Sequence, residues 1–121
     1  MKVKIDTKEK MHVITIEEQK LTANMTEELQ KTLLSYLEKP IKNVVVSFEH
    51  ITHIDETSAK TLLNIQQTFY ETGNSMVFCK FLPNVEKFLE ENEILEIMNV
   101  TPTESEAWDI VQMEEIEREL F

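Results

Sequence analysis

The chain contains 121 residues, carries a formal net charge of −11 and is 41% hydrophobic, a composition that favours one folded domain over a disordered chain. The excess of acids disfavours nucleic acids and anionic membranes as partners, because both are themselves negative. The polar N-terminus MKVKIDTKEK does not resemble a signal peptide, and no apolar run is long enough to span a bilayer. The single cysteine, Cys79, fits a reducing compartment, so we expect one cytoplasmic domain over residues 1–121.

The first third of the chain predicts a β-hairpin followed by a helix. Residues 2–6 and 11–16 are rich in β-branched side chains, and the polar residues between them suit a hairpin connection. Asn24 and Glu27 have the spacing of a capping box, which predicts the start of a helix. Leucines then recur at helical spacing, so we expect one buried stripe on a helix that ends near Pro40.

The middle of the chain predicts two further strands with a helix between them. Residues 43–48 form a continuous apolar run of the kind that is buried on both faces of a sheet. The period of the apolar side chains over residues 57–72 predicts a helix, and Gly73 stands where a left-handed C-terminal cap is expected. Residues 75–81 predict the next strand.

The last third predicts two more helices. Pro83 and Asn84 open a short one, and residues 95–100 are either a short strand or an extended segment. Thr101, followed by a proline and by Glu104, predicts the start of a final helix that runs to the terminus. Because single strands alternate with helices, we expect an α/β fold with a mixed, mostly parallel sheet, right-handed crossovers and about four helices.

The sequence offers weak candidates for a metal site and for a reactive thiol. His50 and His53 lie three residues apart near Glu49, but zinc sites want three or four ligands and only His12 remains, so we expect no metal. Cys79 lies inside a predicted apolar strand. A thiol in such a place is more often a small buried hydrophobe than a nucleophile.

An enzymatic alternative would use His53 with the hydroxyl of Thr57 or Ser58. It lacks a third group that would orient the histidine in a recognisable motif, so we expect no enzyme. Gly73 is the only glycine, whereas loops that cradle phosphates use several. We therefore also expect no cofactor.

Two groups of acidic residues have electrostatic interpretations. Asp55 and Glu56 come at the predicted start of a helix, where acids favour the positive end of the macrodipole and Asp55 can act as a cap. From residue 104 onward, seven acids stand against one cation, Arg118. This segment is either the solvated face of a terminal helix or a partner-facing acidic surface anchored by Trp108 or Phe121.

Taken together, the motifs resemble the STAS family, the anti-sigma factor antagonists and their relatives, from about His12 to Val111. VITIEEQKLTA (13–23) is similar to the family's second strand and following turn. NVVVSFEHITHIDETSAKTLL (43–63) resembles its strand, its turn with the motif Asp-Ser-Ser/Thr-Gly, and the helix that follows. Residues 71–111 resemble the family's helix end, next strand and C-terminal elements in the same order.

The resemblance implies a small α/β domain that binds proteins and is not an enzyme. Stand-alone members bind an anti-sigma factor that is also a serine kinase of the histidine-kinase-like ATPase type, and so release a bacterial sigma factor. The kinase phosphorylates the serine directly after the turn aspartate. Phosphate there breaks the complex, because about two negative charges appear at the helix N-terminus that forms the docking surface.

This sequence departs from the family motif at two positions. Asp55 matches the aspartate, but Glu56 stands where the phosphorylated serine is expected. Thr57 matches the second hydroxyl residue, and Ser58 replaces the glycine. Either Glu56 partly imitates the phosphorylated state, or regulation has moved to Thr57 or Ser58 as candidate phosphoacceptors.

The resemblance puts the partner-binding surface at the turn and the helix start, beside the 21–25 turn and the 82–85 loop. The residues expected in it are His53, Asp55, Glu56, Thr57, Ser58, Lys60 and Thr61. The leading interpretation is an anti-sigma factor antagonist that binds such a kinase. The alternative is a scaffold that assembles with itself or with other STAS proteins and has no kinase switch.

Overall fold

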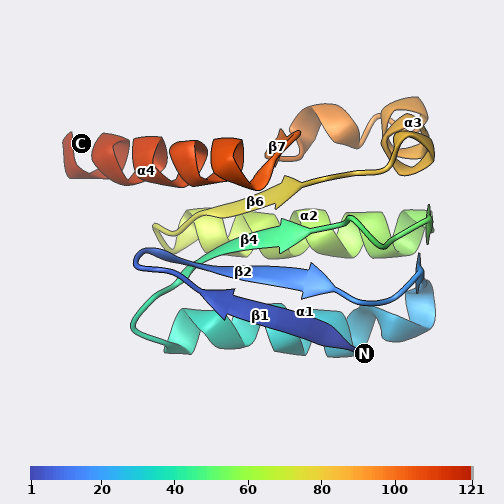
Figure 1. Ribbon diagram of the computed structural model, residues 1–121, viewed down its shortest axis with the longest axis horizontal. Coiled ribbons are helices and arrows are strands. Elements are labelled where there is room, and N and C mark those ends of the chain that lie inside the picture. The colour runs from blue at the N-terminus through green and yellow to red at the C-terminus, as the bar shows by residue number, and fades with distance from the viewer. Residues whose placement is uncertain (121) are drawn as a thin grey trace.

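The computed structural model describes residues 1–120 and contains a layered α/β domain (Figure 1). The strands are β1 (Val3–Thr7), β2 (Met11–Ile16), β3 (Lys20–Leu21), β4 (Asn43–Ser47), β5 (His53–Ile54), β6 (Met76–Cys79) and β7 (Val100–Thr101). The α-helices are α1 (Thr26–Leu34), α2 (Glu56–Glu71), α3 (Pro83–Glu91) and α4 (Glu104–Leu120). Short 3-10 turns are η1 (Ala23–Met25), η2 (Ser35–Glu38) and η3 (Leu95–Ile97).

The main sheet has the strand order β1-β2-β4-β6-β7. Only the β1–β2 hairpin is antiparallel, and every other neighbouring pair in this sheet is parallel. The prediction of a mixed, mostly parallel sheet with helical crossovers is therefore confirmed. A second, two-stranded sheet pairs β3 with β5, which sequence reasoning did not predict because each strand is only two residues long.

The two faces of the sheet bury different helices. Alternate residues such as Val44 and Val46 belong to a large core with α1, α2 and α3, and Figure 1 shows α1 and α2 behind the sheet. The residues between them, such as Val45 and Val77, pack against α4 in a smaller core. Because side chains alternate along a strand, the continuous apolar run of β4 is the consequence of burial on both faces.

The first helix does not begin as predicted. A 3-10 turn, η1, precedes α1, and the residue that caps α1 is Met25, which offers no side-chain hydrogen bond. Asn24 instead accepts a hydrogen bond from the Thr22 hydroxyl, so the Asn24–Glu27 capping box was a wrong prediction. The chain remains in a tight turn here because the amide of Met25 already bonds to the carbonyl of Thr22.

The residue that caps the last helix is Thr103, two residues after the predicted cap Thr101. Thr101 belongs to β7, and its hydroxyl donates to the carbonyl of Thr103. Thr103 is the residue whose hydroxyl accepts from the amide of Glu106, at the first turn of α4. Residues 95–100 are likewise divided, since η3 occupies their first half and β7 starts only at Val100.

Two helices end in the same Schellman motif but with different residues at the left-handed position. After α2 this residue is Gly73, with φ of 79°, as the sequence predicted. After α3 it is Glu93, with φ of 59°. In each case the next amide bonds back to the helix, from Asn74 to Phe69 and from Ile94 to the carbonyl five residues earlier.

We expect Glu93→Gly to stabilise the domain by about 0.5–1 kcal/mol, because glycine adopts a positive φ without the steric cost that a Cβ brings. Glu90→Gly, an exposed change inside α3 that removes the same charge, is the control and should destabilise by about 1 kcal/mol. Urea unfolding followed by circular dichroism measures both changes in the free energy of unfolding. Equal destabilisation by the two variants would contradict the assignment of strain to Glu93.

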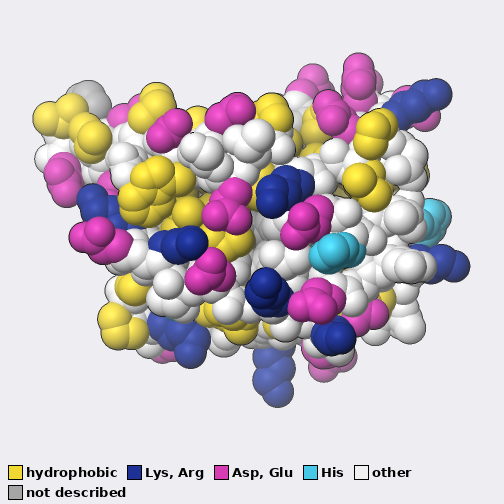
Figure 2. All heavy atoms as spheres, in the orientation of Figure 1, with side chains coloured by type: hydrophobic (Ala, Val, Ile, Leu, Met, Phe, Trp, Pro, Cys, Tyr) yellow, Lys and Arg dark blue, Asp and Glu magenta, His cyan; other side chains and the backbone are white. Residues whose placement is uncertain are grey.

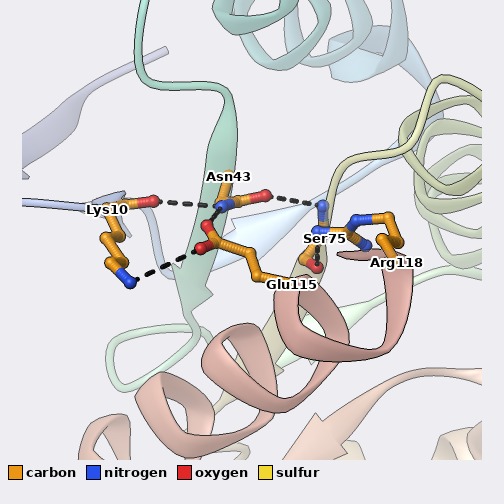
Figure 3. A network of polar contacts seen from close by, with 5 residues as sticks. All are labelled: Lys10, Asn43, Ser75, Glu115 and Arg118. Carbon is orange, nitrogen blue, oxygen red and sulfur yellow. Dashed lines mark hydrogen bonds and ion pairs between the residues drawn. The ribbon is translucent and has the colours of Figure 1, made fainter. Parts of the chain in front are cut away.

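A buried amide ties α4 to the start of three strands (Figure 3). Asn43, at the start of β4, donates from Nδ2 to the carbonyl of Lys10 (3.1 Å) and to Oε1 of Glu115 (2.5 Å). Its Oδ1 accepts from the amide of Ser75 (2.9 Å). Arg118 of α4 donates to the Ser75 hydroxyl (3.1 Å), so two turns of α4 are held against the same end of the sheet.

Replacing Asn43 by alanine should lower the free energy of unfolding by about 2 kcal/mol, because the carbonyl of Lys10 and the buried amide of Ser75 lose their hydrogen bonds. Asn64→Ala, at an exposed position on α2, is the matched control and should change stability by less than about 0.5 kcal/mol. Chemical denaturation of the two variants and the parent chain gives the comparison. A loss at position 43 no larger than the control would show that the network adds nothing to stability.

Candidate functional site

Three loops meet at the end of the sheet where the parallel strands finish. The chain enters β5 there because the amides of Thr52 and His53 both donate to the carbonyl of Gln19. The amide of Asp55 donates to the carbonyl of Leu21, and the side chain of Asn84 donates to the carbonyl of Thr52. The turn at 21–25, the turn before α2 and the start of α3 therefore form one surface, as the sequence predicted, and it lies at the right in Figure 1.

Asp55 holds this surface together and starts α2. It has extended backbone (φ −95°, ψ 168°) and caps the helix by accepting from the amide of Ser58 at 2.8 Å. Its second oxygen accepts from the amide of Ala23 at 2.7 Å. We call these two hydrogen bonds the Asp55 clasp. The predicted cap is confirmed, whereas the bond to Ala23 was not predicted because it joins residues 32 positions apart.

The clasp is electrostatically favourable for an ionised carboxylate. Partial burial alone would raise the pKa of Asp55, but hydrogen bonding to Ser58 and Ala23 and the nearby His53 ring outweigh it, so this pKa is lowered. The amides at a helix N-terminus also carry the positive end of the helix dipole. The charged form is therefore the one that fits this position.

The expected site residues divide into exposed and buried groups. His53, Glu56, Thr57 and Lys60 are exposed, and Thr61 is partly exposed. Figure 2 shows a histidine and a cation projecting at this end of the molecule. These side chains are within reach of a docking partner.

Ser58 differs from its neighbours because its side chain is fully buried. Among the described residues its hydroxyl finds no hydrogen-bond partner of good geometry, although it lies near the Asp55 carboxylate. Ser58 therefore offers no surface for a partner or a kinase unless the first turn of α2 opens. This finding corrects the expectation that Ser58 is a surface contact and leaves Thr57 as the accessible hydroxyl.

Glu56 is held by a local ion pair. Its carboxylate lies 2.7 Å from the ammonium of Lys60, one turn later on α2, and both side chains are more than half exposed. Such exposed pairs contribute about 0.3–0.5 kcal/mol, so a partner can separate them at little cost. The first turn of α2 thus presents one negative and one positive group side by side.

The other candidate residues have structural surroundings. Cys79 is buried, and burial raises the pKa of its thiol to about 11, which confirms that it behaves as a small buried hydrophobe. His12 is also buried, and its Nε2 donates to the carbonyl of Ile41 while Nδ1 contacts the Thr7 hydroxyl. Within residues 1–120, no three His, Cys, Asp or Glu side chains gather closely enough to hold a metal ion.

The acidic C-terminal helix packs on the sheet through one side only. Trp108 is partly buried against the smaller core, so it is not a free anchor. Phe121, the other predicted anchor, lies outside the described residues. No helix in the described part of the chain combines the length and the apolar character needed to cross a membrane.

The fold and the site define a small α/β domain that presents a helix N-terminus at the carboxyl edge of a mostly parallel sheet. The STAS domain family model matches residues 2–107, and the chain belongs to this family. No curated protein sequence matches the chain.

Three solved structures share the fold. A candidate anti-sigma factor antagonist from Thermotoga maritima is 19% identical (TM-score 0.76; 91% of this chain, 94% of that one). An anti-sigma-factor antagonist (STAS) domain protein from Planctomyces limnophilus is 17% identical (TM-score 0.76; 91% of this chain, 97% of that one). The phosphorylated form of the Bacillus cell fate determinant SpoIIAA is 15% identical (TM-score 0.64; 91% of this chain, 99% of that one). At these identities the likeness establishes the fold alone.

We expect Asp55→Ala to lower the free energy of unfolding by about 2 kcal/mol near neutral pH, since it removes a helix cap and a second hydrogen bond. The folded pKa of Asp55 is depressed, so this stabilisation is present above the unfolded value of about 4 and is lost as pH falls through the folded value. The stability difference between parent and variant should therefore narrow below about pH 4. Urea unfolding across this pH range measures it.

Asp109→Ala, an exposed change on α4, is the control for removal of a carboxylate. Its stability difference from the parent chain should be small at every pH. If the Asp55→Ala difference stays constant into acid, the carboxylate charge is not what stabilises the turn.

Proposed function

We propose that the chain is a non-enzymatic regulatory binding protein, an anti-sigma factor antagonist that docks an anti-sigma factor with serine kinase activity through the start of α2. The Asp55 clasp is the observation that supports this most. It joins the turn before α1 to the start of α2 and leaves Glu56, Thr57 and Lys60 exposed at a helix N-terminus, while Asn84 attaches the start of α3 to the same surface. Membership of the STAS family, and the anti-sigma factor antagonists among the solved structures of this fold, support the same role.

Glu56 takes the place of a regulated charge in this proposal. A phosphate group carries about 1.5–2 negative charges and three acceptor oxygens, whereas a carboxylate carries one charge and two oxygens. The ion pair with Lys60 reduces the field of Glu56 further. Glu56 therefore imitates phosphorylation only in part, and the natural protein keeps some affinity for the kinase.

Thr57 is the proposed residual phosphoacceptor, because its side chain is exposed whereas that of Ser58 is not. Phosphate on Thr57 would lie beside the carboxylates of Asp55 and Glu56. It would thus turn a surface of mixed charge into a strongly negative one. We place this function in the bacterial cytoplasm, where such kinases act.

Affinity capture from lysate of the cells that express the protein tests the proposal. We expect tagged parent protein to enrich a histidine-kinase-like ATPase, and Glu56→Ser to enrich it more strongly, because the change removes the negative charge at the docking surface. Glu27→Ser is the matched control, since Glu27 is an exposed acid in the first turn of α1. Quantitative mass spectrometry compares the three preparations, and Glu27→Ser should behave as the parent does.

The other results have distinct meanings. Capture by Glu56→Ser alone would make the natural protein a decoupled relative that its own charge keeps from the kinase. Recovery of STAS proteins in place of any kinase would replace the antagonist by the scaffold alternative. Equal capture by all three preparations would remove Glu56 from the docking surface.

A further inference from the structure

A second surface lies along the β7 edge of the sheet and runs from the C-terminal end of α2, remote from the Asp55 clasp, to the side of α3 at Glu86. Three neighbouring hollows of about 360, 420 and 410 Å³ follow one another there. The first and second share Met98, and the first and third share Tyr70 and Glu114. They lie side by side between α2, α3, η3 and α4, and together we call them the edge groove.

The groove exists because β7 is too short to cover its neighbour. It pairs with β6 only at Phe78 and Cys79, so Met76 and Val77, which pair with β4 on their other side, have no strand beside them on the β7 side. Asn99 covers part of this edge, because its side-chain amide donates to the carbonyl of Met76 (3.4 Å) and to Glu114 (3.3 Å). The sheet edge at this point is therefore lined by side chains.

The floor of the groove is preformed. Gln66 on α2 donates from its side chain to the carbonyl of Ile97 (3.1 Å) and accepts from the amide of Asn99 (2.9 Å). These bonds hold η3 against α2 without any ligand. A partner that enters the groove meets a fixed surface, which lowers the entropy lost on binding.

Large apolar side chains near this floor are exposed to solvent. Tyr70 and Ile97 are 69% and 60% exposed. Farther along α4, Met113, Ile116 and Leu120 are 54%, 57% and 72% exposed, and their spacing sets them along one outward face of the helix. Clusters of exposed apolar residues of this kind are typical of interaction sites rather than of inert surface.

The charge of the groove walls selects the occupant. Among the described residues, the walls carry three acids, Glu86, Glu114 and Glu117, against the single cation Arg118. Figure 2 shows acidic side chains along the adjoining upper margin of the molecule, over α3 and α4, with few cations among them. A groove of mixed polar and apolar lining, with exposed Tyr70 and Ile97 and negative walls, is complementary to a segment that has an apolar stripe and flanking Lys or Arg residues.

We propose that the edge groove binds a basic, amphipathic segment of a partner protein. A second copy of this chain fits poorly, because a symmetric contact would bring together two grooves that each carry three acids and one cation, on molecules whose net charge is −11. A nucleic acid is excluded by the same sign of charge. The occupant is therefore a protein segment of opposite charge.

The Tyr70 end of the groove is separate from the surface at the start of α2, whereas its Glu86 end lies on α3, two residues from Asn84 of that surface. Tyr70 lies 14 residues after Glu56 on the same helix, which corresponds to about 21 Å along its axis. A protein docked at the Asp55 clasp does not by that contact fill the groove. The inference therefore stands whether or not the first surface binds a kinase.

The test uses the full chain and a dye-labelled amphipathic peptide of roughly 18 residues, made of Leu on one face and Lys on the other. A peptide of the same composition in scrambled order controls for charge attraction alone. Fluorescence anisotropy gives the dissociation constants, and backbone NMR shifts locate the peptide. We expect the ordered peptide to bind at least about tenfold more tightly and to shift the amides of Gln66, Ile97 and Asn99.

Paired variants then separate the groove from the rest of the acidic surface. Glu114→Gln with Glu117→Gln should weaken the ordered peptide about tenfold. Glu27→Gln with Glu38→Gln, which removes the same charge from α1 and η2, should weaken it less than about twofold. Tyr70→Ser should also weaken binding about tenfold, while Ile5→Ser, at an exposed apolar position on β1, should not.

Several results would overturn the proposal. Equal losses in both charge pairs, or equal binding of the two peptides, would mean attraction to net charge without a site. Shifts confined to residues 53–61 would move the peptide to the first surface. A dimer of the free chain that dissociates on Tyr70→Ser, seen by light scattering, would make a second copy the occupant.

Discussion

Two backbone amides, from Ala23 and Ser58, converge on the carboxylate of Asp55, and the candidate docking surface depends on this convergence. One bond caps α2 and the other joins it to the turn before α1, so helix start and neighbouring loop cannot move independently. Burial opposes a charge here, but the amides and the helix dipole offset it. Alanine at position 55 would leave both amides without the Asp55 carboxylate and free the loop.

The exposed residues after the clasp explain how the helix tolerates an unusual motif. Ser58 lies within α2 and has no positive φ, so the backbone here does not require the glycine expected from the family resemblance. The serine side chain at position 58 is unfavourable for another reason, because its hydroxyl is buried and has no hydrogen-bond partner of good geometry. Glu56 needs no such compensation, since it lies on the surface beside Lys60 and near the positive end of the dipole.

Local patterns predicted β1, β2, β4 and β6, the four helices, the Asp55 cap and the left-handed Gly73, because each depends on residues close together in the sequence. The predictions failed where a distant contact decides. Asn24 was predicted to cap a helix, but the amide of the neighbouring Ala23 donates to the carboxylate of Asp55. Thr101 was also predicted to cap a helix, but the pairing of β7 with β6 keeps this residue in a strand. The burial of Ser58 follows from packing of α2 on the sheet, which no local pattern reports.

Both surfaces lie on α2, but they respond to charge separately. Phosphate on Thr57 would appear about 20 Å along the helix from Tyr70, which is more than twice the Debye length of about 8 Å at physiological salt. Such a charge acts strongly on a partner at the clasp and is almost fully screened at the Tyr70 end of the edge groove. A basic segment in the groove would therefore stay bound while a kinase at the clasp is released, so the two surfaces suit a protein that keeps one partner while it exchanges another.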